Sequence, residues 1–394
     1  MMVRYLTMVF AALFLGLPAQ GYAGACVPEA CAAEIEAPQG LVESPFDSRK
    51  LTDIMRELGI PGMSIAVIWD FRVHWAKSYG VADVKNGAPV TNSTLFQAAS
   101  ISKPVAAMAV LRAVQDGKFS LDEDINNVLT SWKLPKSPFT ESHPVTARTL
   151  LSHISGLGDG FGFPGYRPAE PLPTLVQILD GQKPSNVGPV RMVRAPMVAM
   201  QYSGGGTTVM QLALQDSTHV PFARLMHESV LGPLGMSDSR YEQPLSERHD
   251  RLAARAHDEQ GKAMDVKWHV YPELAAAGLW TTAGDLAKFV IEVQQSIQGR
   301  SNRVLSRSSV QEMLSPVGVG EFAVGFEIER RGQGWYFKHT GSNWGFRSAI
   351  LGHKLKGYGL VVMTNGSRGY SLIPEVLKRV ERAYDWDSLA KPVE

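Results

Sequence analysis

A serine and a lysine three positions apart, Ser100 and Lys103, are the first two residues of the chain whose side chains could react together. They open a strongly apolar stretch, Ser102–Gln115, which predicts a buried helix. Because three positions are nearly one helical turn, both side chains point to the same place. A lysine kept neutral by burial accepts the serine proton, and free N–H groups at a helix start stabilise an oxyanion. The pair therefore predicts a serine nucleophile with a lysine base.

The same spacing recurs once, at Ser388 and Lys391 near the end of the chain. That segment is charged, and we predict no chemistry there. A Ser-x-x-Lys pattern also arises when a helix-capping serine precedes a surface lysine. The apolar helix after Lys103 distinguishes the first pair from this alternative.

A tyrosine precedes a serine and three glycines at 202–206. Such a glycine run predicts a loop in which the backbone can approach a ligand closely. The phenol of Tyr202 could relay a proton if positive neighbours lower its pKa. The alternative is that Tyr202 only packs in the core.

A third candidate segment lies at the end of a predicted strand, where Lys338 is followed by His339, Thr340, Gly341 and Ser342. A strand that ends in glycine and a small residue gives an edge with which a substrate acyl chain could pair. It could also supply a second backbone donor to an oxyanion hole. The alternative is an ordinary strand end with a bulge glycine.

The elements that must position these residues divide into strands at both ends and helices between them. The sequence predicts a helix over 49–58 and a hairpin over 63–79, then strands over 323–330, 334–339, 346–353 and 359–364 and a closing helix over 372–384. Helices over 102–115, 148–152, 206–215, 221–230 and 282–295, with a long loop over 158–171, lie between. We expect an α+β fold in which the terminal strands share one antiparallel sheet, with a cleft beside the helical insertion.

The first residues have the layout of a secretory signal peptide over 1–23, with Arg4, an apolar run and small residues before the cleavage point. The apolar run is shorter than the roughly 20 residues of a membrane-spanning helix, although a short anchor is the alternative. A flexible leader over 24–47 follows. Cys26 stands in a loose lipobox and could carry a lipid; a local Cys26–Cys31 disulfide is the alternative. We expect a periplasmic or secreted protein.

Composition excludes several classes of protein. The 394 residues are 44% hydrophobic and 20% charged, which is typical of a folded chain rather than a disordered one. Lys and Arg number 39 against 38 Asp and Glu, so no electrostatic argument favours nucleic acid. Two cysteines exclude a disulfide framework and a Cys-rich zinc module, and neither a His-Glu-x-x-His nor a phosphate-loop motif occurs. We expect no metal and no cofactor.

Taken together, the three segments resemble the serine beta-lactamase and penicillin-binding-protein family, whose signatures include Ser-x-x-Lys and Lys-Thr-Gly boxes. The resemblance is to the class C-like branch, with its D-alanyl-D-alanine peptidases and family VIII esterases. The phrases LLSHISGL at 150–157, PLGM at 233–236 and AGLWTT at 277–282 look like the same branch. The resemblance implies one domain over 48–385, with sheet parts at about 48–95 and 320–385, a helical part at about 96–319, and a tail at 386–394.

The resemblance also implies a role for each residue. Ser100 would be the acylated nucleophile, and Lys103 would accept its proton or tune the group that does. Tyr202 would act as general acid and base. The backbone N–H groups of Ser100 and Ser342 would form the oxyanion hole. The residues implied to bind the substrate are Ser203, His339, Thr340 and Gly341.

Two positions depart from the family pattern. Gly204 stands where lactamases usually have Asn, so an amide that orients the substrate is lost. His339 stands where they mostly have Lys, so a fixed positive charge for a substrate carboxylate becomes pH-dependent. Both changes lower the expectation of efficient beta-lactamase activity and leave acyl transfer intact.

His153 could be taken for the histidine of a Ser-His-Asp triad, but no Gly-x-Ser-x-Gly elbow supports that mechanism. We expect it to be a structural histidine beside the tyrosine segment. The function expected is therefore a serine hydrolase for D-alanyl peptides, beta-lactams or short acyl esters, with specificity in loops such as 158–171 and 183–197. The alternative is a non-catalytic or single-turnover cell-wall-binding or penicillin-sensing protein on the same fold.

Overall fold

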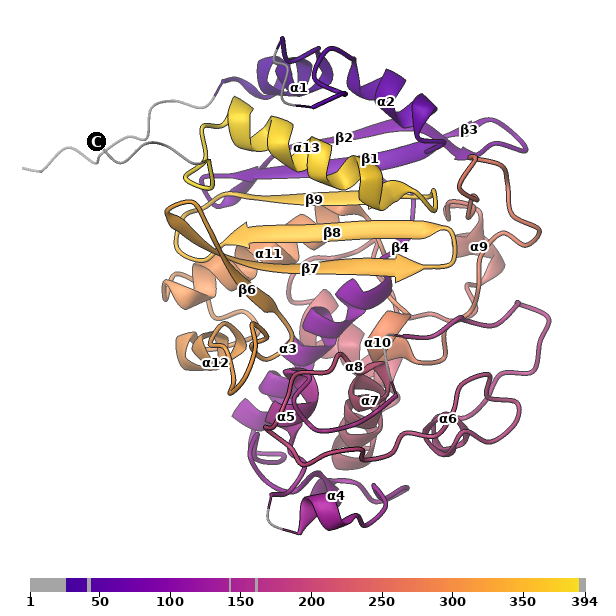
Figure 1. Cartoon of the computed structure of the whole chain (residues 1–394), viewed down its shortest axis with the longest axis vertical. Helices are drawn as coiled ribbons and strands as arrows, with labels where there is room; N and C mark the ends of the chain where they lie inside the picture. Colours follow the sequence, from indigo (N-terminus) through magenta and orange to yellow (C-terminus); the bar gives the residue numbers. More distant parts are fainter. Residues whose placement is uncertain (1–25, 41–43, 142, 160–161, 390–394) are drawn as a thin grey trace, which may run out of the picture.

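The structure, a computed structural model, describes residues 26–40, 44–141, 143–159 and 162–389 (Figure 1). The signal peptide expected over 1–23 and Lys391 of the second Ser-x-x-Lys pattern lie outside these residues. No described helix is both long and apolar enough to cross a membrane.

A seven-stranded antiparallel sheet joins the two ends of the chain, in the order β3-β2-β1-β9-β8-β7-β6. The N-terminal strand β1 pairs directly with the last strand β9, from Met63 opposite Thr364 to Ile68 opposite Gly359. This confirms the expected antiparallel sheet shared by the terminal strands. The strands are β1 (Gly62–Trp69), β2 (Arg72–Asp83), β3 (Ala88–Pro89), β6 (Glu327–Arg331), β7 (Gly334–Asn343), β8 (Phe346–His353) and β9 (Gly359–Thr364).

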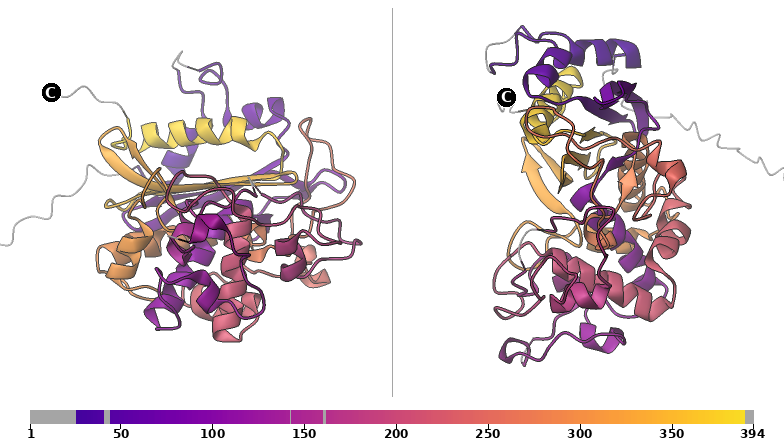
Figure 2. Two further views of the ribbon diagram at one scale, coloured as in Figure 1. Left: turned by 60° about the horizontal axis from the view of Figure 1, so that its bottom comes forward. Right: turned by 90° about the vertical axis from the view of Figure 1, so that its right-hand side faces the viewer.

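The central strands β1 and β9 are buried along almost their whole length because helices cover both faces of the sheet. Alternate residues of β1 therefore enter two different cores: Ile65 packs toward α1, α2 and α13, and Ala66 packs toward α11 and the helical part. Figure 2 shows these layers, with α13 over one face and the helical part under the other. The covering helices are α1 (Pro28–Glu36), α2 (Leu51–Glu57), α11 (Ala283–Ile297) and α13 (Gly369–Ala383).

The helical part fills the chain between β3 and β6. Its central helix is α3, and nearly all of its residues are buried, as its all-round apolar sequence predicts. A short two-stranded sheet of β4 (Phe96–Gln97) and β5 (Trp280–Thr281) joins the segment before α3 to the segment after α10. The helices are α3 (Ser102–Gln115), α4 (Ile125–Val128), α5 (Ala147–Leu151), α6 (Leu175–Asp180), α7 (Gly204–Thr218), α8 (Phe222–Met226), α9 (Glu247–Asp250), α10 (Leu274–Ala277) and α12 (Arg307–Met313).

Several elements differ from the sequence prediction. The strand expected to end at His339 continues as β7 to Asn343, so the third candidate segment lies within the strand and not at its end. The glycines at 204–206 form the first turn of α7 instead of a loop. The helix expected over 221–230 is α8 followed by a π-helical turn, His227–Leu231. The strand expected from residue 323 begins only at Glu327, because Gly325 has a φ of +95° and lies against α3, where a Cβ would be 2.6 Å from that of Ala107.

The segment 24–47, expected to be a flexible leader, is instead folded against the last helix where it is described. Helix α1 buries Cys31 and Ile35 completely, and a disulfide joins Cys26 to Cys31. Of the two fates considered for Cys26, the structure has the disulfide. The prediction was wrong because the short apolar pattern of α1 gives no sign of its partner, which is supplied by α13 some 340 residues later.

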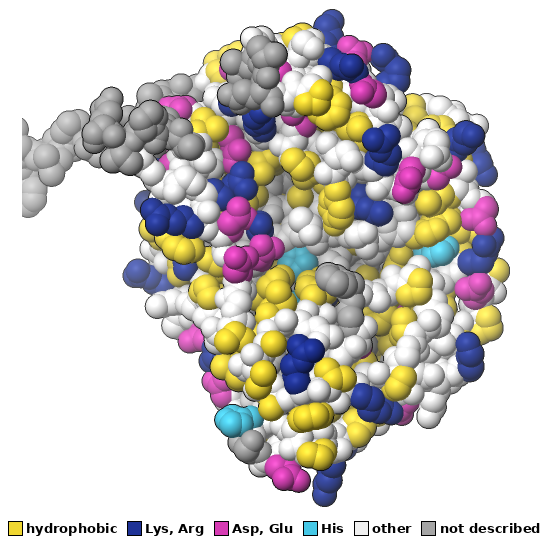
Figure 3. All heavy atoms as spheres, viewed as in Figure 1, with side chains coloured by type: hydrophobic (Ala, Val, Ile, Leu, Met, Phe, Trp, Pro, Cys, Tyr) yellow, Lys and Arg dark blue, Asp and Glu magenta, His cyan; other side chains and the backbone are white. Residues whose placement is uncertain are grey.

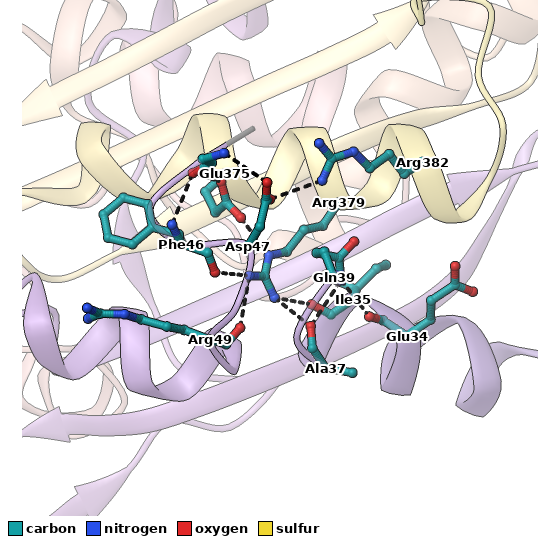
Figure 4. Close-up of polar contacts among 11 residues, drawn as sticks. Glu34, Ile35, Ala37, Gln39, Phe46, Asp47, Arg49, Glu375, Arg379 and Arg382 are labelled. Carbon is teal, nitrogen blue, oxygen red and sulfur yellow. Dashed lines mark hydrogen bonds and ion pairs between the residues drawn. The ribbon is translucent and has the colours of Figure 1, made fainter. Parts of the chain in front are cut away.

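A fully buried arginine of α13, Arg379, holds this N-terminal segment in place (Figure 4). Its guanidinium lies 2.8 Å from a carboxylate oxygen of Glu375 on the same helix. It also donates hydrogen bonds of 2.9–3.0 Å to four backbone carbonyls, those of Ile35, Ala37, Phe46 and Arg49. A buried arginine needs such acceptors for its five N–H groups, so the segment and the helix stabilise each other.

The domain also extends past residue 385, where we expected only a tail. Trp386 is 1% exposed. The carboxylate of Asp387 accepts hydrogen bonds from the Tyr336 hydroxyl at 2.6 Å and from Lys356 Nζ at 2.7 Å. These residues pack beside the β6–β7 turn and join the core on the face of the sheet that α13 covers, which a charged, short C-terminal sequence does not reveal.

Candidate active site

Ser100 lies on a short 3₁₀ turn, η1 (Ala99–Ile101), directly before α3. The neighbouring Ser102 fixes this turn: its hydroxyl donates to the Ala99 carbonyl at 2.5 Å and accepts the Leu279 N–H at 3.0 Å. Ala99 has a φ of +51°, which is uncommon for a residue with a Cβ and marks local strain. The structural serine is therefore Ser102, and the hydroxyl of Ser100 remains directed at the cleft.

The ammonium group of Lys103 reaches the hydroxyl of Ser100. Lys103 Nζ lies 3.2 Å from Ser100 Oγ and donates to the Ala276 carbonyl of α10 at 2.9 Å. Neither partner is charged, and the side chain is almost completely buried. Burial lowers the pKa of Lys103 to about 7, although the more distant charge of Asp159 opposes the shift. Lys103 is therefore available as a neutral base near neutral pH.

Tyr202 completes a group of three with Ser100 and Lys103. Its phenol shares a hydrogen bond with the hydroxyl of Ser100. Lys103 Nζ lies 4.9 Å from the centre of its ring. Burial nevertheless raises the pKa of Tyr202 well above its usual value, so the expectation that positive neighbours lower this pKa is wrong. The phenol therefore keeps its proton, and Lys103 is the member of the three whose pKa, at about 7, lets it exchange a proton near neutral pH.

The imidazole of His153 packs against the ring of Tyr202. Its Nδ1 accepts the backbone N–H of Ser203 at 3.1 Å, and its ring centre lies 4.2 Å from that of Tyr202. Burial, with the nearby charge of Lys103, holds the pKa of His153 well below its usual value. A neutral imidazole that accepts a backbone hydrogen bond agrees with the structural role predicted for His153, which stays a prediction.

Asp159, which the sequence analysis did not single out, positions the residues that follow Tyr202. Its carboxylate accepts the hydroxyl of Ser203 and the backbone N–H of Gly205, both at 2.6 Å. These bonds join the loop that begins at 158 to the start of α7, on both sides of Gly204. An isolated aspartate in a Gly- and Pro-rich loop gives no spacing signal, so only the choice of loop 158–171 as a specificity region pointed here.

The segment His339–Ser342 lies on β7 at the edge of the sheet that faces the cleft. Strand β6 pairs with β7 only as far as Lys338, so from His339 onward this edge has no further strand among the described residues. Figure 3 shows the face that carries the hollow between the sheet and the helical part, with hydrophobic side chains around it. An open strand edge of this kind can pair with an extended substrate.

His339 does not carry the pH-dependent positive charge that the sequence suggested. Its Nδ1 lies 2.7 Å from the Thr340 carbonyl, and its Nε2 is buried with no hydrogen-bond partner among the described residues. Burial, together with the charge of Lys103, lowers the pKa of His339 to about 3. The imidazole is therefore neutral across the physiological range and presents a lone pair instead of a cation.

Gly341 is needed because β7 passes very close to the nucleophile turn. A Cβ at 341 would lie 2.1 Å from the Ala98 carbonyl oxygen and 3.1 Å from the Ala99 Cβ. Ser348 of β8 donates to the same Ala98 carbonyl at 2.9 Å. This close approach holds the edge of β7, including Ser342, beside the backbone of Ser100.

The cleft in which these residues meet has a volume of about 1020 Å³. Six of the residues proposed from the sequence line this cleft: Ser100, Lys103, Tyr202, His339, Thr340 and Ser342. Ser203 and Gly341 are not lining residues, but each is the direct neighbour of one that is. Ser388 instead lies beside Gly332, away from the cleft. The lining residues are Ser100, Lys103, Gly162, Phe163, Met200, Gln201, Tyr202, Ala276, Ala277, Phe322, Glu327, His339, Thr340, Ser342, Asn343 and Tyr370.

Charges around the cleft are few. Among the described lining residues the formal charges belong to Lys103 and Glu327, and Glu327 lies 2.9 Å from Lys338 Nζ in an ion pair. Within the parts of the chain that the structure describes, no group of three or more His, Cys, Asp or Glu side chains could hold a metal ion. The arrangement is thus a serine, a buried lysine and a phenol at the floor of a mostly apolar cleft.

Comparison with known proteins relates this geometry to a family. Residues 48–377 match the Beta-lactamase family. The chain is 30% identical over 285 residues to Protein Rv1367c of Mycobacterium tuberculosis, covering 65% of this chain and 68% of the relative. It is 26% identical over 329 residues to Esterase EstB of Burkholderia gladioli, covering 75% and 77%.

A solved structure shows the same fold. The D-alanine carboxypeptidase AmpC from Burkholderia cenocepacia superposes with a TM-score of 0.65 at 18% identity, over 89% of this chain and 99% of that one. At this identity the likeness concerns the fold alone. With the family match spanning most of the chain, and with serine, lysine and tyrosine together at the edge of an antiparallel sheet, the protein belongs to the beta-lactamase family of serine hydrolase folds.

Proposed function

We propose that this protein is a serine hydrolase that acts through an acyl-enzyme on Ser100 and hydrolyses an ester or an amide. The observation that carries the proposal is the position of Lys103, buried without a charged partner 3.2 Å from Ser100 Oγ, with a pKa of about 7. A buried lysine of ordinary pKa would be a permanent cation and could not accept a proton. Here it is neutral in a large fraction of molecules at neutral pH.

Acylation begins when Ser100 Oγ attacks the substrate carbonyl carbon. The serine proton moves to the lone pair of neutral Lys103, while a lysine N–H keeps its bond to the Ala276 carbonyl. The carbonyl π electrons move to the oxygen, which the backbone N–H groups of Ser100 and Ser342 stabilise. When this oxyanion collapses, the bond to the alkoxy oxygen or amine nitrogen breaks. The leaving group takes the proton from Lys103 through the Tyr202 hydroxyl.

Deacylation repeats the same steps with water. A water molecule attacks the acyl carbon and gives its proton to Lys103, the bond from carbon to Ser100 Oγ breaks, and Oγ recovers that proton. Tyr202, with its raised pKa, acts in both halves as a protonated phenol that passes a proton on. The net reaction consumes one water and releases one acid and one alcohol or amine.

The candidate substrates are D-alanyl peptides, beta-lactams and short acyl esters. One relative of the chain carries the name esterase, and one structural neighbour that of a D-alanine carboxypeptidase, so both ester and amide chemistry occur on this fold. We further propose export to the periplasm or the medium. The signal-like sequence over 1–23 and the Cys26–Cys31 disulfide both favour an oxidising compartment.

The test is acyl-enzyme formation and turnover by the purified mature protein. It is incubated with a fluorescent penicillin and, separately, with p-nitrophenyl butyrate, and the adduct is read by intact mass. Ser100→Ala should abolish both adduct and turnover, and Ser388→Ala should change neither. Full activity of Ser100→Ala would overturn the proposal. A stoichiometric burst without steady-state turnover would favour a penicillin-sensing or wall-binding protein instead.

A further inference from the structure

We propose that Phe163 determines which acyl groups the cleft accepts, and that it selects uncharged, apolar ones. This inference rests on the proposed acyl transfer at Ser100 and adds the substrate class. Phe163 lies on the loop that begins at 158, and its half-buried side chain lines the same cleft as Ser100 and Tyr202.

The ring of Phe163 occupies the space that a side chain at 204 would need. A Cβ built on Gly204 would lie 2.8 Å from Cε2 and 3.4 Å from Cζ of Phe163. Gly204 is the first residue of α7 and is not among the residues with positive φ, so its backbone would allow any side chain. A side chain at 204 would therefore displace the aromatic ring, although the backbone conformation there does not itself demand glycine. The two residues form a matched pair.

The loop is attached to the protein on both sides of Phe163. Before it, Asp159 accepts the Ser203 hydroxyl and the Gly205 N–H, so the loop is bonded to the residues that flank Gly204. After it, Tyr166 exchanges two backbone hydrogen bonds with Val270, of 2.7 and 2.8 Å. These attachments fix the ring against α7 and give the cleft a defined aromatic wall.

Among the described lining residues, no cation is free to pair with a negatively charged acyl group. The nearby Arg347, over the Tyr370 ring, donates to the Asn343 and Phe346 carbonyls. Lys103 is already bonded to Ser100 and the Ala276 carbonyl. Lys338 is paired with Glu327 and Glu329. A carboxylate placed against the aromatic ring of Phe163 would lose hydration with no free cation in the described part of the cleft lining to compensate for it. An apolar chain would lose only unfavourable contact with water.

Other apolar side chains extend the surface that Phe163 begins. Met200, Phe322 and Tyr370 line the same cleft from separate parts of the chain. A volume of about 1020 Å³ is enough for an acyl chain together with a leaving group. Binding energy gained along the acyl chain, beyond the reacting carbonyl, then raises kcat/KM for longer chains.

The experiment compares kcat/KM for p-nitrophenyl acetate, butyrate, octanoate and hydrogen succinate. The wild type should prefer octanoate over acetate and should use the succinate, whose acyl group carries a carboxylate, at least about tenfold less well than butyrate. Phe163→Ala should lower the octanoate-to-acetate ratio at least about tenfold, and Phe163→Leu should retain most of it. Phe139→Ala removes an aromatic side chain that is 40% exposed outside the cleft lining and should leave the ratio unchanged.

A double-mutant cycle tests the pairing itself. Gly204→Ala alone places its Cβ against the ring and should impair hydrolysis of octanoate, whereas the same change in the Phe163→Ala background should cost little further. Equal effects of Gly204→Ala in both backgrounds would overturn the inference. An unchanged acyl ratio in Phe163→Ala would also overturn it. If the alanine variant does not fold, an unchanged ratio in Phe163→Asn, which replaces the ring by a polar amide, would overturn it instead. Succinate used as well as butyrate by the wild type would contradict the charge argument.

Failure of this inference is distinguishable from failure of the proposed function. If Ser100→Ala keeps ester turnover, the acyl-transfer proposal is lost whatever Phe163 does. If Ser100→Ala is inactive but Phe163→Ala leaves the octanoate-to-acetate ratio unchanged, the hydrolase proposal stands and only the specificity assignment is lost.

Discussion

Gly341 of β7 lies so close to Ala98 that a Cβ at 341 would be 2.1 Å from the Ala98 carbonyl oxygen. Ala98 stands two residues before the nucleophile Ser100, so this contact sets the distance between the strand edge and the nucleophile turn. It links a residue of the last third of the chain to the start of the central helix α3. The geometry of the proposed oxyanion hole depends on it.

Gly341→Ala should therefore lower kcat/KM by about 100-fold, because a displacement of roughly 1 Å in such a site has that cost. The measurement is ester turnover together with the rate of acyl-enzyme formation. Gly284→Ala in α11 is the matched control, since the nearest atom to its added Cβ is 3.9 Å away. Wild-type kinetics in Gly341→Ala would show that the strand edge and the nucleophile move independently.

The pH profile of acylation should report Lys103. Because the base must be neutral, kcat/KM should rise about tenfold per pH unit below pH 7 and level off above the pKa of about 7. Lys103→Arg, which stays charged, should cost at least about 100-fold at every pH. Lys85→Arg at the surface should leave the profile unchanged. A profile that is flat through pH 7 would remove Lys103 from the role of base.

Glu273 should make folding stability depend on pH. It is fully buried, neither carboxylate oxygen has a hydrogen-bond partner among the described residues, and burial raises its pKa from 4.5 to about 8. Between these values the unfolded chain releases the proton and the folded protein keeps it, so the free energy of unfolding falls as pH rises from about 4.5 to 8.

Glu273→Gln keeps the shape and removes the ionisation, so its stability relative to the wild type should increase from pH 5 to pH 8. The expected difference is on the order of a few kcal/mol, measured by urea unfolding at both pH values. Glu321→Gln, at an exposed position, is the control and should show no such trend. A pH-independent difference for Glu273→Gln would contradict the assignment.

Arg379→Met should destabilise the protein by about 3–5 kcal/mol, because it leaves the buried Glu375 carboxylate and four backbone carbonyls without their donor. Urea unfolding measures the loss, and hydrogen exchange in α1 should increase with it. Arg56→Met, whose side chain is 77% exposed, is the control. An unchanged free energy of unfolding would show that the N-terminal segment contributes nothing to the fold.

Local pattern was sufficient to predict much of the fold. The limits of α3, β8 and β9 agree with the residue ranges expected from periodicity, because each has a long apolar run between clear breakers. The α1 segment was not predictable, since its stability depends on Arg379 far along the chain and not on its own composition. Tertiary contact overrode local expectation there.

The site divides in the same way. Ser100 and Lys103 are three residues apart on one turn, so the sequence alone brings their side chains together. Asp159 and Phe163 reach the cleft only because a loop folds back on α7, and no spacing encodes that. The pKa values of Tyr202 and His339 differ from expectation because burial, which a sequence does not show, is the largest influence on both: it raises the pKa of the phenol and lowers that of the imidazole.

The pairing of β1 with β9 has a consequence for how the chain folds during its synthesis. Strand β1 can pair early with β2 on one side, but on its other side Met63 to Ile68 must wait for β9, which ends at Thr364, so the sheet cannot close until residue 364 has been made. Contacts of such long sequence separation make folding slow and cooperative rather than stepwise from the N-terminus. The helical part, whose contacts span shorter stretches of sequence, can form earlier. The nucleophile turn meets Gly341 of β7 and Ser348 of β8 only after these strands have been made.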